Sequence, residues 1–251
     1  MATKDKKQAI FCICVLIYAV AVLFRLAAFL LNPLLSRDPA LYLTQADLWY
    51  ETGDYMQTFL PGIVVPPLPL WIMKTALQTG FQAEIAGRTI AMVLGAFLPV
   101  AGVLFAWKIT RKIRIGLIAA LLVIIHPELV SYSFQPLREN FYFFFEALLL
   151  VTLVDAIQKD HVMKWALCGC FLSLSFFCRY EALQFLAVIP FLLALLLLCR
   201  KIKLKQAFLD ISAFFLLFVL TAIPLLWAVD FNCRFLTGKI GQIIVKLGFP
   251  A

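Results

Sequence analysis

The residues best able to do chemistry in this sequence stand at the ends of long apolar runs. Carboxylates and imidazoles can exchange protons, whereas guanidinium groups can hold anions. Ionisable side chains at membrane depth are costly, and they usually mark a binding site or an ion pair. The candidates are Asp38, Glu84, Arg88, His126, Glu128, Arg138, Glu139, Arg179 and Glu181.

Several of these candidates also have a purely structural explanation. Asp38 precedes Pro39, and this pair is typical of the N-cap and the first position of a helix, here over residues 38–52. Arg138 and Arg179 could instead extend to lipid headgroups. A helix cap and two snorkelling arginines therefore remain alternatives to a site.

The other candidates have structural alternatives too. Glu139 suits the first turn of a helix, where the helix dipole favours a negative charge. Glu84 and Arg88 are four residues apart and can form an ion pair on one helix face. His126 precedes a proline, and such a histidine is more often an interface residue with satisfied hydrogen bonds than a base.

The composition identifies the class of protein that carries these residues. Of the 251 residues, 64% are hydrophobic and 14% are charged, and the mean hydropathy is +0.97. A soluble domain is about half apolar and about a quarter charged, so this chain is predicted to be a polytopic membrane protein. The net charge of +8 is then explained by basic cytoplasmic loops, and no nucleic acid is expected as a partner.

The apolar runs predict an all-α bundle of about seven transmembrane helices. Residues 161–199 are too many for one helix across about 30 Å of hydrocarbon, so they are interpreted as a hairpin that turns near Arg179. Arg25 and Glu146 lie inside two of the spans and are predicted to pair. The spans cover residues 8–31, 85–107, 114–132, 137–157, 162–178, 180–199 and 207–229.

Basic residues predict the orientation of these spans. With the N-terminus inside, the clusters at residues 4–7, 108–114, 159–164 and 200–205 all fall on the cytoplasmic side, as the positive-inside rule requires. The chain is thus expected in the cell (inner) membrane, with the candidate residues on the extracytoplasmic face.

A long external loop over residues 32–84 separates the first two spans. Its segments 38–52 and 66–80 are predicted to be helices that lie along the membrane surface, because each is too short to cross it. Residues 230–251 form a predicted external tail, and residues 1–251 a single membrane domain. The 7 cysteines have no metal-binding spacing, so neither a metal nor a cofactor is expected.

A set of short motifs follows one another along the chain in a characteristic order. The motifs are "DPALY" from Asp38, "GDY", "PPLPLW", "GFQAEIAGR", "HPELVSYSFQPLREN" and "CRYEAL". Their order resembles the GT-C type membrane glycosyltransferases, in particular the family of dolichyl-phosphate-mannose protein mannosyltransferases and bacterial aminoarabinose transferases, and the similarity covers the front seven-helix module. Two positions depart from the family pattern, since Pro39 replaces a second acid and Val65 replaces a lysine.

This resemblance implies transfer of a sugar, with inversion, from a polyprenyl phosphate to a protein, lipid or glycan acceptor. Asp38 matches the position of the family's general base, which takes the proton of the attacking group. The leaving phosphate needs positive charge but no general acid. The residues expected to bind the substrate and its lipid phosphate are Arg88, Arg138, Glu139, Arg179, Tyr42 and His126.

A second hypothesis belongs to a different class of protein. The chain can be a non-catalytic membrane module that binds polyprenyl lipids, or a subunit of a larger assembly in which a partner chain supplies missing helices. Membrane lipid is a partner under either hypothesis. Transfer of sugar by the protein itself distinguishes the two.

Overall fold

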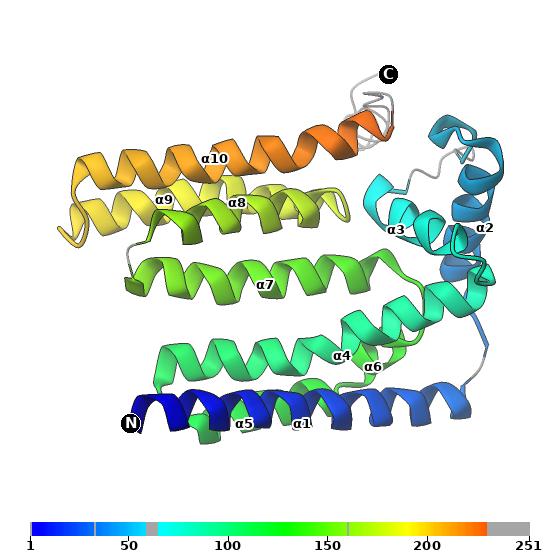
Figure 1. Ribbon diagram of the computed structural model, residues 1–251, viewed down its shortest axis with the longest axis horizontal. Coiled ribbons are helices and arrows are strands. Elements are labelled where there is room, and N and C mark those ends of the chain that lie inside the picture. The colour runs from blue at the N-terminus through cyan, green and yellow to red at the C-terminus, as the bar shows by residue number, and fades with distance from the viewer. Residues whose placement is uncertain (1, 33, 59–64, 160, 230–251) are drawn as a thin grey trace, which may run out of the picture.

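The computed structural model describes residues 2–32, 34–58, 65–159 and 161–229, and every regular element among them is helical (Figure 1). The predicted all-α class is therefore confirmed. The elements are α1 (Ala2–Leu31), α2 (Arg37–Thr52), η1 (Tyr55–Thr58), α3 (Pro67–Leu77), α4 (Ala83–Thr110), α5 (Ile113–Ile125), α6 (Pro127–Ser133), α7 (Arg138–Lys159), α8 (Val162–Phe176), η2 (Tyr180–Leu183), α9 (Gln184–Leu198) and α10 (Leu204–Trp227).

The described residues contain five helices long and apolar enough to cross a membrane, or up to six if the bent pair α5–α6 is one span. The predicted count of seven is thus not confirmed. The seventh candidate, α8, is apolar but has only 15 residues. A helix of that length reaches about 22 Å at 1.5 Å per residue, which is less than the hydrocarbon thickness.

The third predicted span, residues 114–132, is broken rather than straight. α5 and α6 meet at an angle of 65°, and Pro127 is the first residue of α6. Proline has no N–H to donate and its ring excludes the preceding carbonyl, so the helical ladder ends just before it. His126, in an extended conformation, forms the joint between the two helices.

Two glycines allow helix backbones to approach each other closely. A Cβ atom on Gly169 of α8 would lie 2.0 Å from the carbonyl oxygen of Phe214 in α10. A Cβ atom on Gly116 of α5 would lie 3.0 Å from the carbonyl oxygen of Val103 in α4. Helices α8 and α10 therefore form one tightly packed pair and α4 and α5 another, with α7 lying between α4 and α8 (Figure 1).

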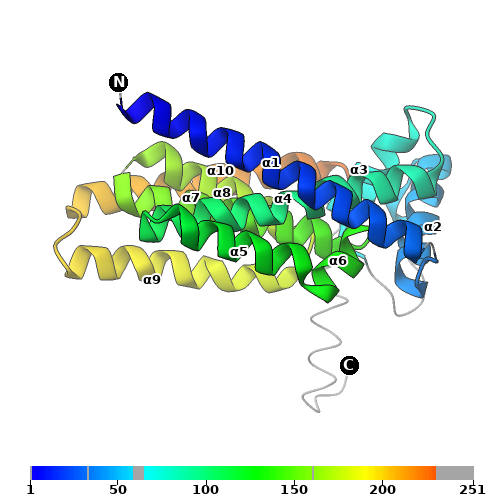
Figure 2. The same ribbon diagram turned by 90° about the horizontal axis from the view of Figure 1, so that it is seen from below.

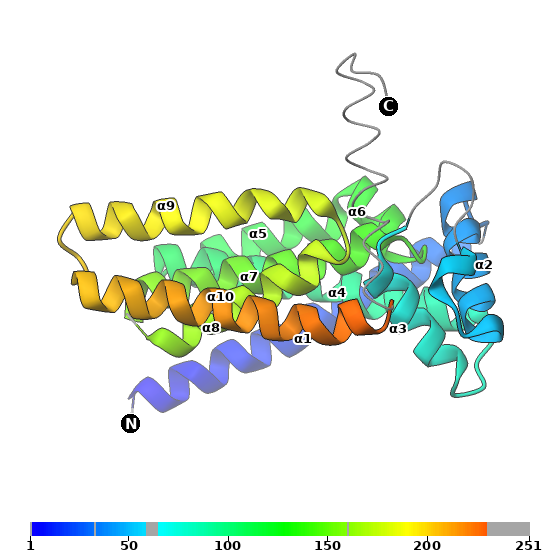
Figure 3. The ribbon, with the colours of Figure 1, turned by 90° about the horizontal axis from the view of Figure 1, so that it is seen from above.

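The two ends of the bundle carry different segments. The N-terminus and the α4–α5 and α9–α10 turns lie at one end, whereas α2 and α3 cover the other (Figure 1). Helices α1 and α9 lie at opposite edges of the bundle (Figures 2 and 3). The predicted external tail, residues 230–251, is outside the described residues.

Candidate active site

The segment formed by α2, η1 and α3, here called the cap segment, packs its buried side chains into the same hydrophobic core as α7, α8 and α10. Gly53 ends α2 in a left-handed conformation, with φ of 73°, and donates its N–H to the Trp49 carbonyl. The chain then folds back, so that the rings of Trp49 and Tyr55 lie 4.9 Å apart. The Tyr55 hydroxyl donates to the Val65 carbonyl at 2.6 Å, and Lys74 lies over the Trp49 ring.

Two contacts fasten the cap segment to the ends of the membrane helices. The Ser36 hydroxyl donates to Gln135 Oε1 at 2.6 Å, which joins the start of α2 to the turn before α7. The Leu68 N–H donates to the Phe177 carbonyl at 3.2 Å, which joins α3 to the end of α8. Asn140, which is buried, holds the turn before α7 by donating to the Gln135 carbonyl at 2.8 Å.

The start of α2 differs from the prediction in a way that changes the role of Asp38. The N-cap is Ser36, and Asp38 lies in the first helical turn rather than at the cap. The Asp38 side chain is exposed and makes no hydrogen bond or ion pair with any residue that the structure describes. A capping role therefore does not explain this carboxylate.

An ionic cluster connects the start of α7 with the turn before α9. Glu139 Oε1 lies 3.3 Å from Arg138 Nε on its own helix and 3.3 Å from Arg179 Nη1. Arg179 also contacts Glu181 through Nη2, at 3.0 Å. The other oxygen of Glu139, Oε2, is buried and has no hydrogen-bond partner among the described residues. One carboxylate thus holds two guanidinium groups that come from distant parts of the chain.

Tyr42 brings α2 into the same neighbourhood. Its side chain is only 5% exposed, and burial is the main reason that its pKa is raised. The charges of Arg138, Glu139, Asp38 and Arg179 also act on the Tyr42 hydroxyl, some lowering and some raising its pKa. Four other predicted site residues therefore contribute to the electrostatic environment of the Tyr42 hydroxyl.

Two further residues of α7 continue the cluster. The Arg179 guanidinium lies 5.6 Å from the centre of the Tyr142 ring, which is a cation–π contact. Glu146 lies one turn further along α7 from Tyr142. The sequence prediction missed Tyr142, although its position three residues after Glu139 and four before Glu146 puts all three on one helix face.

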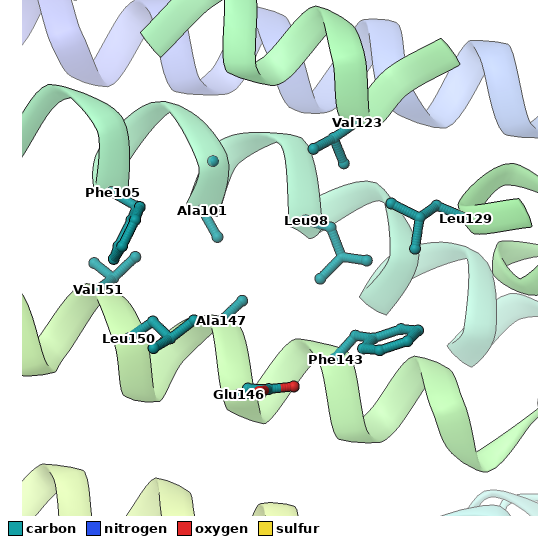
Figure 4. Close-up of a pocket in the computed structure, with 11 residues that line it drawn as sticks. Leu98, Ala101, Phe105, Val123, Leu129, Phe143, Glu146, Ala147, Leu150 and Val151 are labelled. Atoms are coloured by element: carbon teal, nitrogen blue, oxygen red, sulfur yellow. The ribbon is translucent and has the colours of Figure 1, made fainter. Parts of the chain in front are cut away.

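Glu146 borders an apolar hollow between α4 and α7. Figure 4 shows its carboxylate among the side chains that line this hollow, with α4 on one side and α7 on the other. The hollow has a volume of about 260 Å³, and its other lining residues are all apolar. It begins at Phe143, about one helical turn from Glu139. An apolar chain could therefore lie in it with a polar end at the ionic cluster.

Two predicted site residues have other contacts. Arg88 pairs with Glu84 on the same helix at 2.8 Å and lies 4.9 Å from the centre of the Phe29 ring. His126 is exposed, and its Nδ1 accepts a hydrogen bond from the Leu129 N–H at the start of α6. The part of both residues in a site stays a prediction.

Arg25 and Glu146 do not form the predicted ion pair. Arg25 is fully buried and donates to the Ala21 carbonyl on its own helix at 3.3 Å. Among the described residues it makes no ion pair, and two of its nitrogen atoms have no partner. Glu146 instead borders the hollow between α4 and α7.

Comparison with known protein families shows which family this chain belongs to. Residues 64–227 match the model of the dolichyl-phosphate-mannose-protein mannosyltransferase family, which is well over half of the chain. The chain belongs to this family. A comparison with curated proteins found no match. Membership of the mannosyltransferase family makes the chain a multi-pass membrane glycosyltransferase of the GT-C type, and the matched region includes α7, η2 and the ionic cluster.

Proposed function

We propose that this protein transfers a sugar from a polyprenyl-phosphate donor to an acceptor on the extracytoplasmic face of the membrane, with inversion. The observation that carries this proposal is the ionic cluster in which Glu139 Oε1 lies 3.3 Å from Arg138 Nε and 3.3 Å from Arg179 Nη1. The cluster lies at the end of the bundle that α2, with Asp38 in its first turn, also covers (Figure 1). The family's name supplies the donor class, a polyprenyl phosphate that carries a sugar.

Asp38 is the proposed general base. An acceptor hydroxyl must lose its proton as it attacks the anomeric carbon, and a carboxylate within hydrogen-bond reach can take that proton. The exposed, uncommitted carboxylate of Asp38 is suited to this task. Inversion needs one base and a leaving group on the opposite side of the sugar, so a second catalytic carboxylate is not required.

Arg138 is the proposed contact for the donor phosphate. Its Nε is held by Glu139, but its two terminal nitrogens make no hydrogen bond with another described residue. Arg138 is also the first residue of α7, where the helix dipole favours an anion. Arg179 has all three nitrogens engaged by Glu139 and Glu181, so its proposed role is to position Glu139 and add charge.

The apolar hollow supports the polyprenyl character of the donor. An isoprenoid chain lying between α4 and α7 would remain in the hydrocarbon while its phosphate reached the cluster above Phe143. Because charge at the phosphate grows as the sugar leaves, guanidinium groups fixed at that point would stabilise the transition state more than the ground state.

The proposed orientation places the active site outside the cell membrane and the N-terminus in the cytoplasm. It is supported by the separation of the two ends, since the basic α4–α5 and α9–α10 turns lie opposite the cap segment (Figure 1). Lysine and arginine concentrate in cytoplasmic loops.

The test compares Asp38→Asn with Asp47→Asn, two charge-removing changes on exposed positions of the same helix. Purified protein in lipid nanodiscs receives radiolabelled mannose on dolichyl phosphate, with membrane extract as the acceptor source. Loss of a general base costs about 10²- to 10⁴-fold in rate, so Asp38→Asn should lose transfer at least a hundredfold on that scale. Asp47→Asn should retain it.

Melting temperatures of both variants show whether the fold is intact. Equal transfer by Asp38→Asn and the unchanged protein would remove Asp38 from the mechanism. If the unchanged protein transfers neither mannose nor aminoarabinose but still binds polyprenyl phosphate, the non-catalytic lipid-binding module is the correct function.

A further inference from the structure

The α9–α10 turn, at the end of the bundle opposite the candidate active site, carries a concentrated positive charge. Arg200, Lys201 and Lys203 line a hollow of about 550 Å³ together with Leu197, Ile202 and Gln206. All three basic side chains are exposed. No acidic residue lines the hollow, and the nearest acid along the chain, Asp210, is buried and accepts a hydrogen bond from Gln206.

Two basic residues at the α4–α5 turn, Lys108 and Arg111, are used differently. Lys108 forms an ion pair with Asp155, and Arg111 donates to Gln158, so both contacts join α4 to α7. By contrast, Arg200, Lys201 and Lys203 make no ion pair or side-chain hydrogen bond with any described residue. The α9–α10 turn thus offers charge that the fold does not use.

The backbone fixes the direction of this turn. The Arg200 N–H donates to the Leu197 carbonyl and the Lys201 N–H donates to the Leu196 carbonyl, at 2.9 Å each. These two bonds define a Schellman motif, whose residue after the C-cap is usually glycine. Here that residue is Arg200, with φ of 56°. An arginine in a conformation that side chains disfavour is consistent with a binding role for its charge.

Exposed apolar side chains beside the turn are suited to contact the acyl chains of a lipid. Leu198, Leu204 and Phe208 are 77%, 72% and 68% exposed, on helices that are candidate membrane spans. A ligand at this place would meet cations at the membrane surface and hydrocarbon directly below them. Phospholipids with an anionic headgroup have this combination, and basic pockets between membrane helices bind them.

We propose that the hollow at the α9–α10 turn binds the headgroup of an anionic phospholipid from the surrounding leaflet. Its phosphate is held by Arg200, Lys201 and Lys203, and its acyl chains lie along Leu198 and Phe208. This inference does not depend on the proposed glycosyl transfer, since the site lies at the other end of the bundle.

The test is the affinity of the purified full-length protein for palmitoyl-oleoyl phosphatidylglycerol, measured by native mass spectrometry in detergent. The variant Lys201→Gln/Lys203→Gln loses two charges at the hollow, and the control Lys112→Gln/Arg114→Gln loses two exposed charges at the α4–α5 turn. On the usual contribution of each basic residue near an anionic lipid, the first variant should bind roughly tenfold or more weakly. The control should bind as the unchanged protein does.

Two further measurements complete the test. Lys201→Arg/Lys203→Arg should bind phosphatidylglycerol normally, which separates loss of charge from loss of fold. Phosphatidylcholine, which has no net charge, should bind weakly to every variant. Equal weakening by the two charge-removing variants, or equal affinity for the two lipids, would overturn the proposal.

Discussion

The two ends of the bundle use ionic contacts in different ways. At the end that holds the N-terminus, Lys108 and Asp155 are only 14% and 13% exposed and join α4 to α7. At the end covered by the cap segment, Glu139 is shared between Arg138 and Arg179, and each arginine is about a quarter exposed. The first arrangement is enclosed, whereas the second is open to a ligand.

This difference separates charged residues that hold helices together from charged residues whose donors stay available to a ligand. Replacing either partner of an enclosed ion pair lowers the stability of the fold, because the remaining charge is left buried and uncompensated. A shared carboxylate leaves donors available, as it does at the terminal nitrogens of Arg138. The cluster around Glu139 is only partly buried, and its proposed role in binding is tested by the variants below.

The largest expected effect is on Arg138. Arg138→Gln removes the guanidinium that we propose contacts the donor phosphate, and loss of one such preorganised donor costs about 10²- to 10³-fold in rate. The matched control is Arg111→Gln at the opposite end, which should leave transfer unchanged. Transfer of labelled mannose from dolichyl phosphate measures both. If Arg138→Gln and Arg111→Gln transferred sugar at the same rate, the proposed difference between the two ends would be wrong.

Hydropathy and charge alone predicted much of the fold. The apolar runs identified the all-helical class, and the cap segment contains helices where residues 38–52 and 66–80 indicated them. The gathering of Asp38, Arg138 and Arg179 was expected because helix ends on one side of a membrane share a face. Arg138 and Arg179 do meet, through Glu139, whereas the place of Asp38 in a shared site stays a prediction.

Other features depend on packing that a sequence pattern does not contain. Many membrane helices tolerate a proline, so the presence of Pro127 alone did not predict that the span would break at 65° here. The N-cap of α2 is Ser36 rather than the predicted Asp38. The Ser36 hydroxyl donates a hydrogen bond to Gln135, a residue 99 positions away, and a local sequence pattern does not contain such a contact. Arg25 does not meet Glu146, since it donates to a carbonyl of its own helix, whereas Glu146 borders the hollow between α4 and α7.

A smaller effect is expected at the enclosed pair. Lys108→Gln leaves Asp155 without its ion pair in a mostly buried position, which should lower the free energy of unfolding by about 1–3 kcal/mol. The melting temperature should fall by a few degrees, while the transfer rate of the folded protein should not change. The control is Glu139→Gln, which should reduce transfer with a smaller change in melting temperature. If Glu139→Gln lowered the melting temperature more than Lys108→Gln, and Lys108→Gln reduced transfer more, the proposed roles of the two ends would be wrong.

The smallest effect is expected from two arginines that share an unusual backbone conformation. Arg111 and Arg200 have φ of 60° and 56°, where glycine is favoured over other residues by about 1 kcal/mol. Arg200→Gly should therefore raise the free energy of unfolding by about 0.5–1 kcal/mol, because the Arg200 side chain has no described partner. Arg111→Gly relieves the same strain but loses the hydrogen bond to Gln158, so its gain should be smaller or absent. Thermal unfolding of both variants in detergent free of anionic lipid measures the difference. A larger gain for Arg111→Gly would mean that its contact with α7 contributes nothing, and that the two basic turns do not differ in the way described.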